Sequence, residues 1–470
     1  MSTVLAFDFG ASSGRAILAC YDGAKLTYRE IHRFSNDPTW ENGHLCWNYP
    51  ALLAEVKKAV AMCGKVDALA FDTWGVDYGL LDADGSLMGL PVNYRDGRTA
   101  GLPKKLSEKL SAQALYRETG NQIMPINTLF QLMAEEKRDA AKLLFMPDLF
   151  AWALCGTVST DKTIASTSQM VDPRTGNWNE AVRAYSGFPG ELFPEIRECA
   201  TVCGEYQGIK VIKVAGHDTQ CAVAAMPCRE GEEAAFLSCG TWSLIGCELD
   251  APILTEKSME DALSNELGAN GKVNYLKNIS GLWLIQEIRR NFRAQGREYS
   301  YNDMEQLARK EPAFACLIDP DAPEFAVAGD VPGKIRAFCE RTGQPIPATD
   351  GALVRCIYES LAMKYRYAIA QIQENTEKCF DVLHLLGGGT KDTFLCQMAA
   401  DFLGIPVAAG PAEATALGNI LLQLLALGDI PDLAYGRELI RRQEKVDRYQ
   451  PRTVANLEQA YQKFCTIIHE

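Results

Sequence analysis

Histidine is scarce in this sequence and no Cys-x-x-C pair occurs, so a zinc cluster has little support. The 470 residues include 16 cysteines but only five histidines, whereas zinc sites need thiolates and imidazoles at short spacings. The cysteines are scattered, often within apolar runs, and we expect most of them to behave as small buried hydrophobic side chains. Cys199 and Cys203 are close enough to pair, but nothing indicates secretion, which disfavours a disulfide.

The sequence also has no basic leader and no uncharged apolar run of about 18 residues, the length that a membrane helix requires. We therefore expect a cytoplasmic protein with no signal peptide and no transmembrane helix. Hydrophobic residues make up 47% of the chain, which suffices for large buried cores in two or three domains. We expect a monomer or a small homo-oligomer.

Positive charge is in deficit, because the formal net charge is −13. A nucleic-acid-binding surface needs clustered lysine and arginine and is therefore not expected. A small phosphate ligand is still compatible with this charge, since backbone N–H groups and a metal ion can hold it. Neither a Walker loop nor a dinucleotide fingerprint is present at the glycine triplet 387–389. That triplet alone is typical of a tight turn.

The hydrophobic pattern predicts an α/β protein. Apolar runs at residues 4–9, 15–21 and 25–34 indicate a meander of strands, and helical spacing follows at 49–63 before another strand at 68–74. Residues 107–156 look mostly helical. A second strand meander starts near residue 233, and helices are predicted at 282–294, 352–374, 417–427 and 454–468. Because both halves begin with strand, glycine, hydroxyl residue and strand, we expect two similar domains, 1–232 and 233–470.

Two stretches have the residue types of a phosphate site and a polyol site. Residues 8–15 place two glycines, two serines and Arg15 at a turn between strands, where backbone N–H groups could hold phosphate and Asp8 could bind Mg²⁺ through water. A hairpin turn without a ligand explains them equally well. Residues 72–77 combine two carboxylates with Trp74 and Gly75, which suits a polyol. A strand end with a buried tryptophan and solvated acids is the alternative.

Asp218 is the candidate general base. It follows a short strand at residues 210–214, and a carboxylate at that end of a strand can take a proton from an attacking hydroxyl. Asp218 could instead cap the helix that starts near Thr219, and the local residues alone favour this cap. The two roles are compatible. A helix N-terminus should lower the pKa of Asp218 and keep it ionised.

In combination and in this order, the motifs resemble those of the FGGY carbohydrate kinases, which belong to the actin-like ATPase superfamily. The resemblance covers nearly the whole chain. It is carried by DFGASSGR (8–15), DTWGVD (72–77), GLPVNYRD (89–96), NTLFQL (127–132), HDT (217–219), SCGTWSL (238–244), KNISGLW (277–283) and GPAEAT (410–415). The sequence departs from the family at Cys239, where serine is common, and at Gly216, where serine or alanine is usual.

The resemblance implies two ribonuclease-H-like domains flanking a deep cleft, and transfer of phosphate from MgATP to a ketose. The first two motifs are most similar to those of members that phosphorylate the 1-hydroxyl of L-rhamnulose. L-Fuculose is an alternative substrate, and a non-catalytic regulator that binds ATP and sugar is an alternative function. By this resemblance Asp218 is the base, and the sugar meets Gly75, His217, Asp218, Thr219 and Asn278. The nucleotide meets Ala11, Ser12, Ser13, Gly14, Arg15, Thr241, Gln286 and Gly388. The residue chemistry described above adds Trp74 and Asp77 to the sugar site and Asp8 as the metal ligand.

Overall fold

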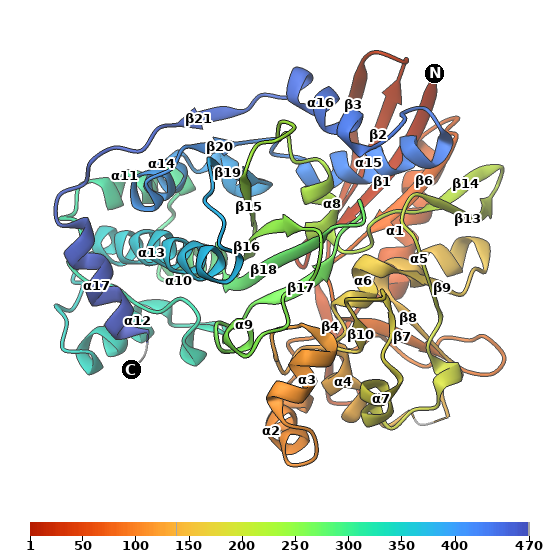
Figure 1. Cartoon of the computed structure of the whole chain (residues 1–470), viewed down its shortest axis with the longest axis horizontal. Coiled ribbons are helices and arrows are strands. Elements are labelled where there is room, and N and C mark those ends of the chain that lie inside the picture. Colours follow the sequence, from red (N-terminus) through yellow and green to blue (C-terminus); the bar gives the residue numbers. More distant parts are fainter. Residues whose placement is uncertain (138, 469–470) are drawn as a thin grey trace. The chain divides into compact units, whose positions relative to one another are not determined.

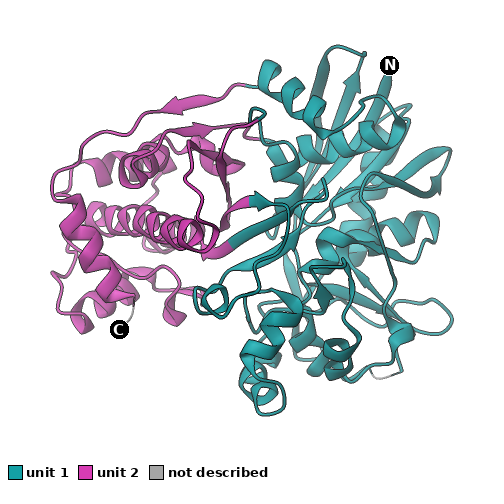
Figure 2. Ribbon diagram, in the orientation of Figure 1, with its two compact units in different colours: residues 1–230, 248–276, 413–444 teal, residues 231–247, 277–412, 445–470 magenta. Residues whose placement is uncertain are grey.

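The computed structural model describes residues 1–137 and 139–468, and its helices and strands are labelled in Figure 1. The chain forms two compact units, and it passes between them several times (Figure 2). Unit 1 consists of residues 1–230, 248–276 and 413–444. Unit 2 consists of residues 231–247, 277–412 and 445–470. Neither unit is therefore a continuous piece of sequence.

Unit 1 is built around a six-stranded sheet with the order β13-β14-β6-β1-β2-β3. β1, β2 and β3 form an antiparallel meander, and β6 and β14 add parallel strands beside β1. The strands are β1 (Ser2–Phe9), β2 (Ser13–Tyr21), β3 (Leu26–Ser35), β6 (Ala68–Asp72), β13 (Thr201–Tyr206) and β14 (Ile209–Lys213). The predicted meander and the predicted strand after the first helix are confirmed, and the structure shows that this strand runs parallel to β1.

The two faces of this sheet follow from the alternation of side chains along β1 and β6. Odd-numbered aromatic residues point to one face, where Phe9 and Phe71 stack on Phe150 of helix α5 (Met146–Cys155). Even-numbered small residues point to the other face, which α8 (Asp218–Ala224) and α15 (Ala414–Leu427) cover. Asp8 and Asp72 are also even-numbered, so they lie on the α8 side.

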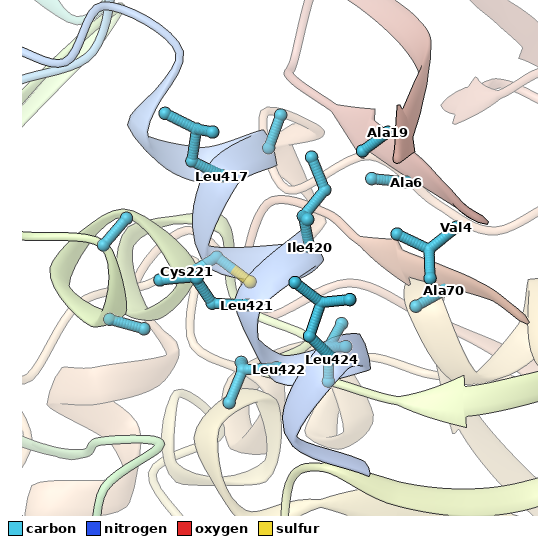
Figure 3. Packing of buried hydrophobic residues seen from close by; sticks show 14 of the residues in the cluster. Val4, Ala6, Ala19, Ala70, Cys221, Leu417, Ile420, Leu421, Leu422 and Leu424 are labelled. Atoms are coloured by element: carbon cyan, nitrogen blue, oxygen red, sulfur yellow. The ribbon is translucent and has the colours of Figure 1, made fainter. Parts of the chain in front are cut away.

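The core under α15 explains why the C-terminal part of the chain returns to unit 1. The cluster joins Val4 and Ala6 of β1 and Ala70 of β6 to Leu417 and Ile420 of α15 (Figure 3). Small side chains on the sheet let a largely apolar helix pack closely against it. The prediction of an apolar helix at residues 417–427 is confirmed, and its N-terminus lies three residues earlier.

Smaller elements complete unit 1. The helices are α1 (Tyr49–Met62), α2 (Leu102–Ser107), α3 (Ala112–Thr119), α4 (Thr128–Met133), α6 (Lys162–Ser166), α7 (Glu180–Arg183), α9 (Glu256–Glu260) and α16 (Leu433–Gln443). The additional strands are β4 (Pro38–Glu41), β5 (His44–Trp47), β7 (Tyr78–Leu81), β8 (Lys142–Phe145), β9 (Ser159–Asp161), β10 (Val171–Asp172), β11 (Asn177–Trp178), β12 (Glu195–Arg197) and β17 (Ser264–Leu267).

Unit 2 repeats the pairing seen around β1. β15 (Ala234–Cys239) forms a hairpin with β16 (Trp242–Leu249) and runs parallel to β19 (Val382–Leu386), which is parallel to β20 (Val407–Ala409). β21 (Asp447–Tyr449) adds an antiparallel edge, and β18 (Val273–Ser280) begins in unit 1. The helices are α10 (Trp283–Ala294), α11 (Tyr301–Arg309), α12 (Val331–Arg341), α13 (Asp350–Thr376), α14 (Thr393–Leu403) and α17 (Leu457–Ile467). The arrangement of strands around β15 thus repeats the arrangement around β1.

One prediction of secondary structure is only partly right. Residues 107–156 are helical in α3, α4 and α5, but they also contain β8 (Lys142–Phe145), which pairs antiparallel with β7 (Tyr78–Leu81). A four-residue apolar run suits a strand or a buried helix equally, and only the distant partner decides between them. Of the helices that the structure describes, none combines the length and apolar character needed to cross a bilayer.

Candidate active site

Three carboxylates gather at the carboxyl end of the central strands of unit 1. Asp8 and Asp72 are the last paired residues of β1 and β6 and face each other across the parallel register. The N–H of Asp218 donates to the carbonyl of Thr73 at 2.8 Å, directly beyond β6, and α8 begins at Asp218. Strand ends in parallel sheets are where ligands bind in α/β proteins. The position predicted for Asp218, at a junction of strand and helix, is confirmed.

The pKa of Asp218 is raised to about 6. Burial is the main cause; the nearby His217 lowers the pKa and Asp8 raises it. The prediction that a helix N-terminus would lower this pKa is wrong, since the peptide N–H of Thr219, at 2.6 Å from Oδ1, is outweighed by desolvation and by Asp8. The side chain is still 32% exposed. A partly accessible carboxylate with this pKa suits a general base near neutral pH.

Asp72 behaves differently because it is completely buried. Burial and the charges of Asp8 and Asp218 raise its pKa, against a hydrogen bond from Asn419 Nδ2 to Oδ2 at 2.7 Å. Like charges in a shared low-dielectric site favour protonation of one partner. We interpret Asp72 as a member of the cluster whose environment favours the protonated form.

The turn between β1 and β2 presents the predicted phosphate loop. Its N–H and carbonyl groups close a tight turn, with the N–H of Gly10 donating to Ser13 O at 2.9 Å, and Ser12 is exposed at its tip. Gly14 has no space for a side chain, because a Cβ there would overlap the ring of Phe34. Arg15 forms ion pairs with Asp8 and Glu413. Ala11 to Arg15 are thus brought to the same end of the sheet as Asp8.

Among the described residues, no group of three or more His, Cys, Asp or Glu side chains could hold a metal ion alone. Magnesium is usually held by one or two carboxylates together with water and substrate phosphates. The Asp8 carboxylate at a strand end, beside a loop with an exposed serine, fits such a site.

The need for glycine at position 216 is explained by the side chain of Asp161, whose role could not be predicted from the sequence. Asp161 Oδ2 accepts a hydrogen bond from the N–H of Gly216 at 3.0 Å, and its Oδ1 caps α6 through Thr163 and Ile164. A Cβ at Gly216 would overlap Asp161 Oδ2 and lie 2.9 Å from the ring of Pro147. Serine or alanine at this position would displace Asp161, so the departure from the family follows from local packing.

Asp77 holds the predicted polyol segment in place. It is completely buried, and burial raises its pKa to about 6. Its Oδ2 accepts hydrogen bonds from Trp47 Nε1 (2.6 Å), Trp74 Nε1 (3.0 Å) and the N–H of Tyr94 (3.2 Å), and its Oδ1 accepts one from Gln131 Nε2 (2.8 Å). The neighbouring Val76 has φ of 66°, which is strained for a β-branched residue. These contacts favour a role for Asp77 in orienting Trp74.

His217 and Thr219 flank Asp218. His217 is 7% exposed, and its Nδ1 lies 2.9 Å from Glu266 Oε2 while its Nε2 lies 3.5 Å from Asp218 Oδ1. Glu266 was missed by sequence reasoning, because a glutamate in the short strand β17 carries no signal of its own. Gly75, also predicted to meet the sugar, packs against Thr167, where a Cβ would lie 3.1 Å from a methyl group.

In unit 2, three segments with predicted nucleotide-binding residues meet at the ends of β15 and β19. The N–H of Trp283 donates to Thr241 O at 3.2 Å, which ties the start of α10, with Gln286 in its first turn, to the β15–β16 turn. Gly388 is exposed in the glycine turn, where a Cβ at Gly389 would overlap Cys239. Asn278 lies partly exposed on β18. The first turn of α10 and the glycine turn therefore both lie against the β15–β16 hairpin of unit 2.

Comparison with protein-family models gives two matches that together cover most of the chain. Residues 3–226 match the N-terminal domain of the FGGY family of carbohydrate kinases, and residues 235–427 match its C-terminal domain. Rhamnulokinase of Bacteroides thetaiotaomicron is 38% identical over 479 residues, with 98% of each chain covered. Rhamnulokinase of Enterococcus faecalis is 36% identical, with 98% of this chain and 97% of the relative covered.

Solved structures with the same fold are more distant in sequence. A ligand-bound xylulose kinase from Lactobacillus acidophilus superposes with a TM-score of 0.80 at 17% identity, covering 100% of this chain and 98% of the other. Plasmodium falciparum glycerol kinase with ADP gives 0.78 at 15% identity, with the same coverage. At these identities the likeness shows the fold alone.

Proposed function

The chain belongs to the FGGY family of carbohydrate kinases, and from this premise we propose that it transfers the γ-phosphoryl group of MgATP to the 1-hydroxyl of L-rhamnulose. The family makes it an ATP-dependent sugar kinase. The substrate rests on the full-length likeness to proteins named rhamnulokinase. The observation that carries the mechanism is a partly exposed Asp218 with a pKa of about 6 at the carboxyl end of the sheet.

The reaction needs a base, an acceptor and charge stabilisation. Ionised Asp218 accepts the proton of the 1-hydroxyl as its oxygen attacks the γ-phosphorus. The new O–P bond forms as the bond between the γ-phosphorus and the bridging oxygen breaks, and ADP leaves with the electron pair. Asp8 would hold Mg²⁺, which supplies positive charge to the phosphates when it is bound.

Side chains around Asp218 would bind the sugar. His217 and Thr219 offer hydrogen-bonding groups, while Trp74 and Gly75 offer an apolar face and a close backbone approach. The resemblance to the family adds Asn278 as a sugar-binding residue. Asp77 contributes through Trp74, whose indole it orients.

Backbone groups and hydroxyls would bind the nucleotide. In unit 1 they come from Ala11, Ser12, Ser13, Gly14 and Arg15. In unit 2 they come from Thr241, Gln286 and Gly388. Exposed backbone N–H groups in glycine-rich turns are suited to phosphate oxygens.

A panel of ketoses with MgATP and ADP detection tests the substrate. We expect the highest kcat/KM with L-rhamnulose, and a product with phosphate on the 1-hydroxyl by ³¹P and ¹³C NMR. A higher kcat/KM with L-fuculose would make that sugar the substrate. ATP binding without phosphorylation of any ketose would favour the non-catalytic regulator.

The Asp218→Asn variant tests the base. We expect kcat to fall by roughly 10²–10⁴-fold, with sugar affinity by calorimetry largely retained. Asp84→Asn is a matched control, because Asp84 is an exposed turn residue and the change is the same. Near-wild-type turnover by Asp218→Asn would refute the assignment of Asp218 as base.

A further inference from the structure

Glu266 is buried and fixed on the side of His217 that faces away from Asp218. It lies in β17, whose flanking residues are tied to unit 1: the N–H of Asn265 donates to Gly120 O at 2.8 Å and that of Leu267 to Ser166 Oγ at 3.0 Å. Glu266 is 4% exposed, and its Oε2 accepts a hydrogen bond from Gln220 Nε2 at 2.7 Å. A buried carboxylate with few other partners needs a cation nearby.

His217 provides that cation. Its Nδ1 lies 2.9 Å from Glu266 Oε2, and its Nε2 lies 3.5 Å from Asp218 Oδ1, so the imidazole bridges two carboxylates. Burial lowers the pKa of His217, but the charges of Glu266, Asp218 and Asp161 outweigh it and raise the pKa above the ordinary value. Nδ1 lacks the alignment of a hydrogen bond to Glu266 in spite of the short distance, so the imidazolium attracts the two carboxylates through its charge.

We propose that Glu266 is a positioning residue for the catalytic base: it holds His217 as a cation whose Nε2 faces Asp218, and so keeps Asp218 oriented and ionised near neutral pH. The inference rests on the proposed function, in which Asp218 is the base. Glu266 touches no reacting atom and acts only through His217.

The charges around the pair fix the sign of the effect. His217 is faced by Glu266 from β17, Asp161 from β9 and Asp218 from α8. Asp218 is faced by His217 and by two further carboxylates, Asp8 from β1 and Asp72 from β6. Asp8 is itself paired with Arg15. The positive charge of His217 thus opposes the effect of these carboxylates on the pKa of Asp218. Without Glu266, His217 loses its proton more readily, and the pKa of Asp218 rises.

The Glu266→Gln variant tests this through the pH profile of kcat/KM. If the acid limb moves up by one pH unit from about 6, kcat/KM falls about five-fold at pH 6 and less than two-fold at pH 8. Glu260→Gln, the same change at an exposed residue of α9, should leave both values unchanged. A merely structural role would lower kcat/KM equally at every pH, and this result would overturn the proposal.

A second variant and a readout without catalysis complete the test. His217→Gln should move the acid limb of the pH profile of kcat/KM in the same direction. The double variant with Glu266→Gln should show no further shift of this limb. An unmoved acid limb in His217→Gln would overturn the proposal. In the intact protein with ¹³C-labelled histidine, the His217 signal should titrate at lower pH in Glu266→Gln than in wild type. Unchanged titration also overturns it. Because NMR needs no substrate, it stays decisive even if no ketose is phosphorylated.

Discussion

The carboxylate of Asp218 is surrounded by groups that act on it in opposite directions. Burial and Asp8 favour its protonated form, whereas His217 and the N–H of Thr219 favour the ionised form. The net result is a pKa of about 6. The folded protein therefore disfavours the ionised carboxylate, although Asp218 must be ionised to act as a base. Such local cost is common at functional sites and is offset by stability elsewhere.

We therefore expect Asp218→Asn to be more stable than wild type at pH 7.5. The folded-state pKa of about 6 lies above the ordinary value of 3.8, so ionised Asp218 destabilises the fold above pH 6. This penalty declines as the pH falls below about 6 and is absent below the ordinary pKa of 3.8, where the group is protonated in both states. The gain in melting temperature by calorimetry should be clear at pH 7.5 and smaller at pH 5. A variant that is less stable at pH 7.5, or a gain independent of pH, would contradict this reasoning.

Individual residues were predictable from the sequence where a local motif marks them. Asp8 and Asp218 follow strands and precede turns, so their place at the strand ends could be predicted. Glu266 and Asp161 could not, because their partners His217 and Gly216 lie some 50 residues away along the chain. The environment of Asp218 was mispredicted for a related reason: burial and the charge of Asp8 depend on tertiary packing, whereas the helix N-terminus is visible locally.

At the scale of elements, α8 and α15 cross with their backbones in close contact. Gly418 makes this possible, since a Cβ there would overlap the carbonyl oxygen of Cys221 in α8. α8 begins with Asp218, and α15 lies against β1 and β6. The crossing therefore fixes the helix that presents the proposed base.

Gly418→Ala should separate the two helices. Overpacking of a filled core costs about 1–3 kcal/mol and occasionally more, and here the obstacle is backbone that cannot rotate away. We expect a lower melting temperature and a lower kcat, measured by calorimetry and by the kinase assay. Gly436→Ala in α16 is the control, because the nearest atoms to its Cβ would be flexible side-chain methyl groups, those of Leu421 at 3.1 Å and of Ile430 at 3.4 Å. Equal effects of the two substitutions would show that the crossing at Gly418 has no special role.

Element types were predictable where periodicity was long or a turn was marked by glycine. The β1–β2 hairpin and the apolar helix α15 are examples, as are the corresponding hairpin and helices of unit 2. β8 was not predictable, because its partner β7 is about 60 residues away. The sequence also marks α15 as buried without indicating what covers it. Its partner is β1, some 410 residues earlier, and only the folded chain shows this pairing.

At the scale of the whole molecule, the two compact units do not correspond to the two sides of a single division of the sequence. The division into domains 1–232 and 233–470 stays a prediction about the two family domains. Unit 1 nevertheless takes residues 248–276 and 413–444 from the second half. The first of these segments carries Glu266, and the second carries α15 with Asn419. The second half thus completes both the core and the polar network of unit 1.

A fragment of residues 1–232 should therefore fail to fold alone. Residues 413–444 give the cluster under α15 nine leucine and isoleucine side chains: Leu417, Ile420, Leu421, Leu422, Leu424, Ile430, Leu433, Leu439 and Ile440. Burying each contributes roughly 1.5–3 kcal/mol, so their loss outweighs the 5–15 kcal/mol that typically separates folded from unfolded states. We expect no cooperative thermal transition and rapid proteolysis for the fragment, and recovery of both on co-expression with residues 233–470. Cooperative unfolding of the isolated fragment would mean that the sheet can cover its own face without α15.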